Sequence, residues 1–206
     1  MNDENIYHSI ALVAFTLAMS ISIFYRHQAA RSGDRISAAR EEGRFPSMVR
    51  SLLGLALWLG ALAYLFNPQW MAWSQVDLPA WLRWFGGLLM LVCVPLIYWV
   101  FSSLGKNVTH TVAIRKEHTL VTRGPYRWVR HPLYSVGLLL FLGFSLLAAN
   151  WFIALTIVAA LKVLSLRTQL EEARLVEKFG DDYRQYMQST GRYLPRIGSM
   201  FGGSRS

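Results

Sequence analysis

The chain alternates between long apolar runs and shorter segments rich in charged residues. A helix needs about 20 mostly apolar residues to cross the hydrocarbon core of a bilayer, with about 17 at the short end of the range. The apolar runs therefore predict membrane-spanning helices. They cover residues 6–25, 51–66, 84–101, 133–149 and 151–166.

The last two runs are separated only by Asn150, so they predict a tight helical hairpin whose arms are both short for a span. The fold class that follows is all-α. We expect a polytopic membrane helical bundle of about five spans, including this C-terminal hairpin, followed by cytoplasmic amphipathic helices.

Apolar positions continue beyond the fifth run at a helical spacing, which predicts an amphipathic extension of that span. Gly180 is a typical stop for such a helix, and Asp181 or Asp182 is a suitable cap for the next one. That helix would carry Tyr183 and Tyr186.

Lysine and arginine gather in alternate connections, which predicts the orientation because cytoplasmic loops carry an excess of these residues. We expect the N-terminus outside and the C-terminus in the cytoplasm. The cationic residues are Arg26, Arg31, Arg35, Arg40, Arg44 and Arg50 around the first connection, and Lys106, Arg115, Lys116, Arg123, Arg127 and Arg130 in the third. The second connection has only Arg83, near its end.

Composition supports a membrane protein and argues against a nucleic-acid-binding one. Hydrophobic residues make up 53% of the chain and charged residues 16%, against about 25% charged in an average soluble domain. The net charge of +9 comes from residues between apolar runs, where they would face anionic headgroups. We therefore expect membrane lipids as partners and no nucleic acid. The single cysteine, Cys93, suits core packing, and we expect no metal site.

The first candidate for chemistry is the segment 110–134. Gly124-Pro125 is a turn signal, and Pro132 suits the first turn of the fourth span, where a missing N–H costs nothing. This arrangement puts His131 and Tyr134 at the membrane face. An interfacial anchor of Arg, His, Trp and Tyr is the simpler interpretation of the same residues.

The second candidate is the pair Arg167 and Glu171, which share one helix face because they are four residues apart. They form either an ordinary surface ion pair of little energetic value or a polar clamp for a ligand at the bilayer edge. Lys162 lies within an apolar run. It either extends to the cytoplasmic surface or faces the bundle interior as a functional charge.

Together, the two segments resemble the isoprenylcysteine carboxyl methyltransferase family of membrane enzymes. The resemblance covers about residues 105–195 and rests on two blocks in the same order as in the family, flanking the hairpin. The first block is Leu120-Val121-Thr122-Arg123-Gly124-Pro125-Tyr126 with Arg130-His131-Pro132-Leu133-Tyr134 and Gly137; the second is Arg167, Glu171-Glu172, Phe179-Gly180, Tyr183 and Tyr186.

The resemblance implies methyl transfer from S-adenosylmethionine, held in a cytoplasm-facing pocket, to a lipophilic or lipidated acceptor from the bilayer. It implies catalytic roles for Arg167 and Glu171, with Arg167 on the substrate side and Glu171 at the methionine portion of the cofactor. The other implied cofactor-binding residues are His118, Thr119, Leu120, Val121, Tyr126, His131, Leu133 and Tyr134.

This interpretation divides the chain into three parts. Residues 1–104 would form spans that act as a scaffold with possible lipid contact, residues 105–197 would hold the cofactor, and residues 198–206 would be a flexible tail.

An acceptor carboxylate, as in isoprenylcysteine methylation, needs no general base because it is ionised at neutral pH. A phospholipid N-methyltransferase is the nearest alternative. A sterol-reductase-like enzyme that uses NADPH and a non-enzymatic membrane bundle are further alternatives.

Overall fold

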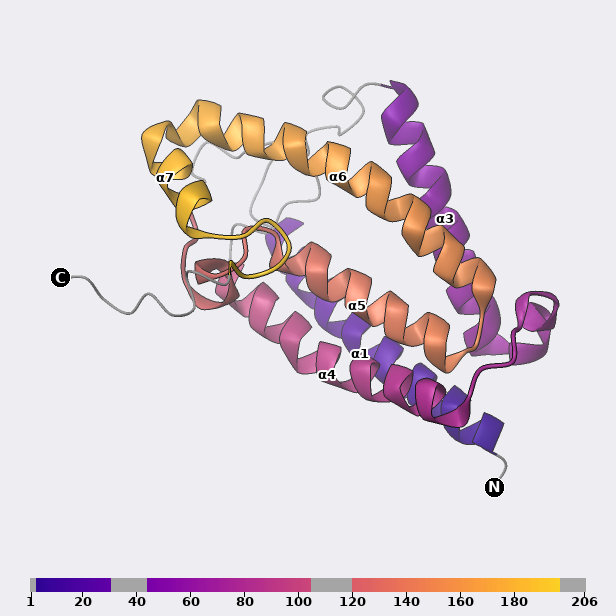
Figure 1. The fold of residues 1–206 in the computed structure, drawn as a ribbon. Coiled ribbons are helices and arrows are strands. Elements are labelled where there is room, and N and C mark those ends of the chain that lie inside the picture. Colours follow the sequence, from indigo (N-terminus) through magenta and orange to yellow (C-terminus); the bar gives the residue numbers. More distant parts are fainter. Residues whose placement is uncertain (1–2, 31–43, 105–119, 197–206) are drawn as a thin grey trace.

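The computed structural model describes residues 3–30, 44–104 and 120–196, and within these residues every named element is a helix (Figure 1). The long helices are α1 (Asp3–Ala30), α3 (Arg44–Phe66), α4 (Ala80–Leu104), α5 (Pro132–Leu147) and α6 (Trp151–Phe179), followed by the short α7 (Asp181–Ser189). Two 3₁₀ helices, η1 (Pro68–Ser74) and η3 (Gly124–Arg127), lie in the connections. The predicted all-α fold is confirmed.

Four of these helices, α1, α3, α4 and α6, are long and apolar enough to cross a membrane. The fifth, α5, has 16 residues, which at 1.5 Å per residue extends about 24 Å, less than the ~30 Å hydrocarbon core. A fifth complete span therefore stays a prediction, as does the orientation of the chain in the membrane.

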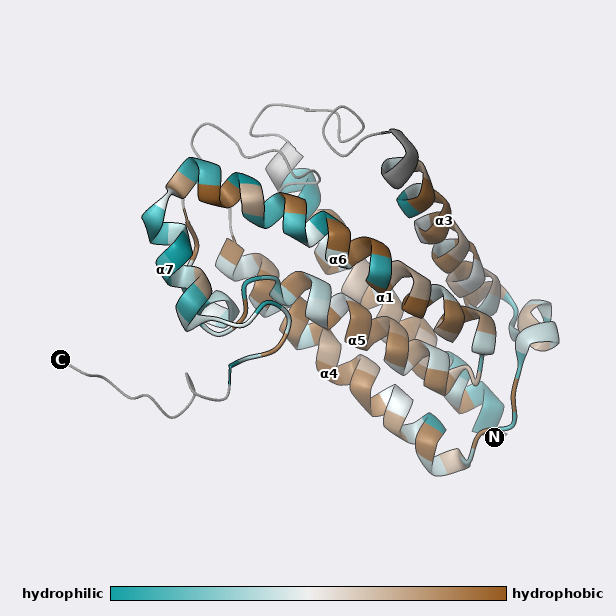
Figure 2. Ribbon diagram, turned by 45° about the horizontal axis from the view of Figure 1, so that its top comes forward, coloured by the Kyte–Doolittle hydropathy of each residue, from teal (hydrophilic) through white to brown (hydrophobic). Residues whose placement is uncertain are grey.

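Helix α6 is longer than the apolar run that predicted its first part, because it continues to Phe179 without a break. Figure 2 shows hydrophilic residues on the part of α6 nearest α7 and on α7 itself, whereas α4 and α5 are mainly hydrophobic. The predicted amphipathic extension is thus one helix with the span. Gly180 ends it, with a positive φ of 57° that favours glycine.

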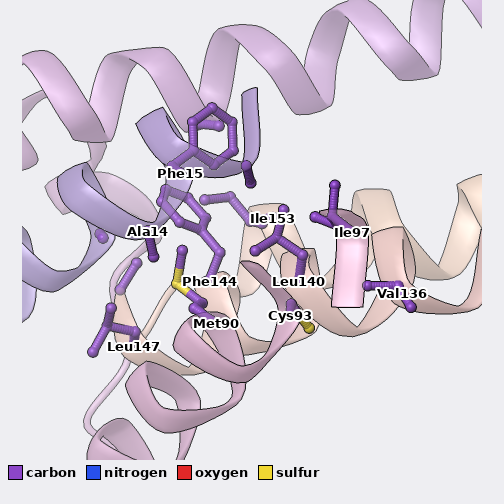
Figure 3. Close-up of a cluster of buried hydrophobic side chains, with 14 of the residues drawn as sticks. Ala14, Phe15, Met90, Cys93, Ile97, Val136, Leu140, Phe144, Leu147 and Ile153 are labelled. Carbon is purple, nitrogen blue, oxygen red and sulfur yellow. The ribbon is translucent and has the colours of Figure 1, made fainter. Parts of the chain in front are cut away.

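The helices pack as two connected groups. Helix α4 packs against α1 and α5, while α6 packs against α3 and, less extensively, against α5. A buried cluster fills the space between them and includes Phe15, Met90, Cys93, Phe144 and Ile153 (Figure 3). Cys93 is fully buried, which confirms its predicted place in the core.

Two glycines set the close approach of α4 and α5. A Cβ atom on Gly86 would lie 2.6 Å from the carbonyl oxygen of Gly143, and a Cβ on Gly143 would lie 2.8 Å from that of Gly86. Small residues at a helix crossing allow the backbones to come this near. This contact fixes α5, which carries part of the candidate site, against the rest of the bundle.

Arg83 lies inside α4, not in a connection as the charge pattern suggested. It forms an ion pair with Glu4 of α1, and its Nε donates to the Leu147 carbonyl oxygen at 3.0 Å. Its guanidinium carbon is 4.1 Å from the centre of the Tyr7 ring. Arg83 therefore links α1, α4 and the end of α5, and its role in this structure is packing.

The α5–α6 connection lies at the same end of the bundle as Glu4 and η1, since Glu4, Gln69 and Asn150 line one cavity. Asn150 caps α6 by accepting a hydrogen bond from the Ile153 N–H at 3.1 Å, as short polar side chains do at this position. Its amide nitrogen also donates to the Ser74 hydroxyl at 2.8 Å. The turn of the predicted hairpin is therefore fixed to η1.

Candidate active site

The candidate site lies where the start of α5 meets the polar part of α6. The Tyr134 hydroxyl donates a hydrogen bond of 3.0 Å to a carboxylate oxygen of Glu171. The same hydroxyl is within hydrogen-bonding reach of Arg167. Arg167 and Glu171 are both half-buried. The predicted pair therefore shares one face of α6 with a third partner from α5, which an isolated surface ion pair would not have.

Local sequence explains why Tyr134 lies there. Helix α5 begins at Pro132, as predicted, with His131 at the position before the helix. A proline at the first helical position has its φ preset and has no N–H to leave unsatisfied. Tyr134 is then in the first turn, and its ring stacks on the His131 ring with centroids 5.6 Å apart and planes 8° from parallel.

An apolar cavity of about 280 Å³ adjoins Tyr134. Helices α1, α3, α4, α5 and α6 all contribute to its walls. Most of its lining is aliphatic or aromatic, including Trp58, Phe101 and Phe141. Leu133, predicted to contact the cofactor, also lines this cavity. The cavity can hold a hydrocarbon group whose polar end is near the Tyr134 hydroxyl.

The carboxylate of Glu172, the next residue after Glu171, has different hydrogen-bond partners from that of Glu171. It accepts hydrogen bonds from Arg130 Nε at 2.8 Å and from a terminal nitrogen of Arg192 at 2.5 Å. His131 Nε2 lies 3.3 Å away. The side chain of Glu172 is only 4% exposed. Since a buried carboxylate needs such partners, we assign Glu172 to holding the site together, not to binding a ligand.

The segment that follows α7 completes this support. The Arg130 N–H donates to the Gly191 carbonyl oxygen at 2.8 Å, and the His131 N–H donates to that of Arg192 at 3.1 Å. The Ser135 hydroxyl donates to the Tyr193 carbonyl oxygen at 2.6 Å. These bonds pin residues 191–193 against the start of α5. The hydrogen bond to Glu172 raises the pKa of Arg192, so this cation persists at neutral pH.

Three buried tyrosines, one from η3 and two from α7, lie around this group of supporting contacts. Tyr183 and Tyr186 come from α7, and the Tyr186 hydroxyl donates to the Tyr126 carbonyl oxygen at 2.6 Å. Burial raises the pKa of Tyr126, Tyr183 and Tyr186 above the usual range. All three hydroxyls therefore stay protonated, and the predicted helix with Tyr183 and Tyr186 packs back on the connector.

The predicted cofactor residues do not all line one cavity. Tyr126 interacts electrostatically with Glu171 and Tyr134, so it lies near the site. Val121 packs against the hydrophobic core. Leu120 instead lines a separate surface cavity of about 390 Å³ with residues of η3 and α7. His118 and Thr119 lie outside the described residues, as does the predicted tail 198–206.

The structure corrects one smaller expectation and decides between the two alternatives given for Lys162. Asp181 and Asp182 do not cap α7 with their side chains; Gly180 occupies the cap position, and Asp181 accepts a hydrogen bond of 2.7 Å from Arg184. Lys162 is exposed, so it does not face the bundle interior.

Sequence reasoning missed the joint role of Arg130, Glu172 and Arg192. Glu172 is beside Glu171 in the chain, but successive helical residues point about 100° apart, which separates their partners. The signal in the sequence was the Gly191-Arg192-Tyr193 segment, a cation and an aromatic residue directly after a short helix. Arg26 was also interpreted only as an orientation charge, although it lines the apolar cavity.

Comparison with known proteins agrees with the predicted resemblance. Residues 87–177 match the model of the isoprenylcysteine carboxyl methyltransferase family. A protein-S-isoprenylcysteine O-methyltransferase of Schizosaccharomyces pombe is 40% identical over 45% of this chain and 41% of its own length. Relatives with the same description from Xenopus laevis and Homo sapiens are 32% and 27% identical, each over 73% of this chain and 52% of theirs. The chain thus spans about half the length of these relatives.

A solved structure also has a similar fold. A eukaryotic intramembrane Ras methyltransferase, isoprenylcysteine carboxyl methyltransferase, matches with a TM-score of 0.56 at 22% identity, over 91% of this chain and 68% of the other. Together with the apolar helices, this match identifies an integral membrane protein. The predicted membrane fold and the family resemblance are both confirmed.

Proposed function

Since residues 87–177 match the isoprenylcysteine carboxyl methyltransferase family, we propose that this protein transfers a methyl group from S-adenosylmethionine to the carboxylate of a lipophilic acceptor. The observation that carries the proposal is the junction at Tyr134. Tyr134 lines the apolar cavity, and its hydroxyl donates to Glu171. A lipid-like group and a cationic cofactor would therefore meet on the two sides of one side chain.

The chemistry of the site fits S-adenosylmethionine. The cofactor carries a sulfonium and an ammonium, which need an anionic partner, and Glu171 supplies a half-buried carboxylate. The Tyr134 hydroxyl orients this carboxylate, and Tyr126 lies near both groups. When bound, the cofactor supplies a methyl group already activated by the sulfonium. Glu171 would hold its methionine portion.

Arg167 would orient the acceptor. A guanidinium can donate two parallel hydrogen bonds to one carboxylate, which fixes the direction of the attacking oxygen. Arg167 is on the same face of α6 as Glu171, so acceptor and donor would be held side by side. Alignment of this kind is the main source of rate acceleration when no proton has to move.

The bilayer is the proposed source of the acceptor. The apolar cavity is bounded by membrane helices, and its walls match a hydrocarbon chain better than water. Residues 1–104 would supply the scaffold and part of this wall, while residues 105–197 would bind the cofactor. The excess of lysine and arginine in the flanking connections supports a site on the cytoplasmic side.

The first test is calorimetry of the purified full-length protein with S-adenosylhomocysteine, followed by transfer of labelled methyl to candidate acceptors. We expect micromolar cofactor binding and methylation of an N-acetylated S-prenylcysteine. Methylation of phosphatidylethanolamine instead would identify a phospholipid N-methyltransferase. Tighter binding of NADPH than of S-adenosylhomocysteine would support a reductase, and binding of neither would overturn the proposal.

A further inference from the structure

Arg26 of α1 is the one charged side chain among the described residues that line the apolar cavity. The other lining residues are hydrophobic apart from glycine, a serine and Tyr134. A single cation on the wall of an apolar cavity is a strong determinant of what binds there, because charge interactions are strengthened where water is excluded.

The Arg26 side chain is held against the cavity by its own helix and by α4. Its Nε donates to the Ser22 hydroxyl at 3.1 Å, one turn earlier in α1. Its guanidinium carbon lies 5.8 Å from the centre of the Phe101 ring, within the range of a cation–π contact. Ser22 and Phe101 both line the cavity. These contacts direct the side chain along the cavity wall.

Arg26 also interacts with the charged and polar groups of the candidate site. It interacts with Tyr134 of α5 and with Arg167 of α6. Two guanidiniums from different helices thus act on the region around the Tyr134 hydroxyl. The two positive charges repel each other. An anion bound between them would be attracted by both and would offset that repulsion.

We propose that Arg26 is a second binding residue for the acceptor carboxylate and sets the specificity for an anionic acceptor. This inference rests on the proposed methyl transfer and adds a residue from α1, a helix outside the region that matches the family model. The hydrocarbon part of the acceptor fills the cavity, and its carboxylate is held between Arg26 and Arg167. An amine acceptor would bring a positive charge toward both guanidiniums, which disfavours it.

The same arrangement favours release of the product. Methylation forms a bond between a carboxylate oxygen and the methyl carbon and breaks the bond from that carbon to sulfur. The acceptor thereby changes from an anion to a neutral ester. An ester has lost the charge that Arg26 and Arg167 bind, so it is held mainly by its hydrocarbon part. The free acid should therefore bind more tightly than its methyl ester.

The experiment compares Arg26→Gln with the wild-type protein, both full-length in lipid nanodiscs. Binding of an N-acetylated S-prenylcysteine and of its methyl ester is measured directly, and binding of S-adenosylhomocysteine is measured in parallel. Loss of a charged hydrogen bond reduces affinity by roughly 10-fold or more. We expect the wild type to prefer the acid by more than this factor, because two guanidiniums bind it, and Arg26→Gln to reduce the preference by about 10-fold. The affinity of this variant for the ester and for S-adenosylhomocysteine should change less than about twofold. Arg26→Lys should retain part of the preference.

Lys162→Gln is the matched control, because Lys162 is an exposed cation of α6 that does not line the cavity. It should keep the wild-type preference for the acid. Equal loss in both variants would mean that general membrane charge attracts the acid and would overturn the inference. So would an unchanged preference in Arg26→Gln, or a fall in S-adenosylhomocysteine affinity, which would assign Arg26 to the cofactor carboxylate. If the wild type binds the acid selectively but transfers no methyl group, the proposed function fails while the anion site stands.

Discussion

Tyr134 and Glu171 are 37 positions apart in the chain, yet the hydroxyl of one donates a 3.0 Å hydrogen bond to the carboxylate of the other. The bond joins the first turn of α5 to the polar part of α6. It brings the two sequence blocks that flank the connection at Asn150 into one site.

Glu171→Gln should weaken binding of S-adenosylhomocysteine at least about 30-fold, because removing one partner of a desolvated charged contact costs about 2–5 kcal/mol. Calorimetry of the purified variant measures the change. Arg167→Gln is the comparison. It should bind S-adenosylhomocysteine within about twofold of the wild type and yet lose methyl transfer, since Arg167 would act on the acceptor. Normal binding and turnover in both variants would locate the site elsewhere.

Tyr134→Phe should reduce affinity for S-adenosylhomocysteine by roughly 10-fold, because Glu171 loses the hydroxyl that orients it. The ring itself remains, so the wall of the apolar cavity and the stacking on His131 are kept. Affinity for the prenyl part of the acceptor, measured with its methyl ester, should therefore stay within about twofold. A large loss of ester binding would show instead that the substitution disturbs the cavity.

Glu172→Gln should destabilise the protein. The buried carboxylate accepts hydrogen bonds from Arg130 and Arg192, and breaking such a pair costs about 3–5 kcal/mol. The apparent Tm in detergent should fall on the order of 10 °C. Glu177→Gln, at an exposed position of the same helix, should leave the Tm nearly unchanged. An unaffected Tm in Glu172→Gln would contradict the structural role given to this residue.

Gly143→Ala should weaken the packing of α5 on α4. The added Cβ would lie 2.8 Å from the carbonyl oxygen of Gly86, and overpacking of this kind costs about 1–3 kcal/mol. Gly137→Ala on the same helix is the control, because a Cβ there meets nothing within 4 Å. Thermal unfolding of the two variants should separate them, with Gly143→Ala the less stable. Equal stability would mean that the two backbones can move apart at little cost.

The methyl-transfer rate with saturating cofactor should vary little with an acceptor carboxylate between about pH 6 and pH 9. A carboxyl group with a pKa near 3.5 is ionised across this whole range, so no proton has to be removed. An amine acceptor behaves in the opposite way, because its reactive neutral form increases about tenfold per pH unit below a pKa near 10. The slope of log rate against pH therefore tests the acceptor class independently of any substitution.

Much of the fold could be predicted from the sequence because spans and helix ends have local causes. The apolar runs located each long helix of the described residues, Pro132 located the start of α5, and Gly180 located the end of α6. The i, i+4 spacing of Arg167 and Glu171 correctly indicated a shared face. These features depend on residues close together in the chain, where periodicity and backbone preferences are informative.

The contacts between helices could not be predicted in the same way. Hydropathy does not say which faces meet, so the approach of Gly86 to Gly143 had no signal of its own. Arg83 lies at the edge of an apolar run and was interpreted as a loop residue, although a pairing with Glu4 allows it to be buried inside a helix. The partners of Glu172 come from both sides of α6 in the chain, and only the folded structure brings Arg130 and Arg192 together.

Because α6 is unbroken, its length can be compared directly with the thickness of the bilayer. About 20 residues separate Trp151, beside the fixed turn at Asn150, from Glu171, and at 1.5 Å per residue this is roughly 30 Å. The hydrocarbon core has about the same thickness. The carboxylate is thus held one core thickness away from the opposite turn. In an untilted helix, a thicker membrane would draw the carboxylate toward the lipid chains and a thinner one would lift it into water.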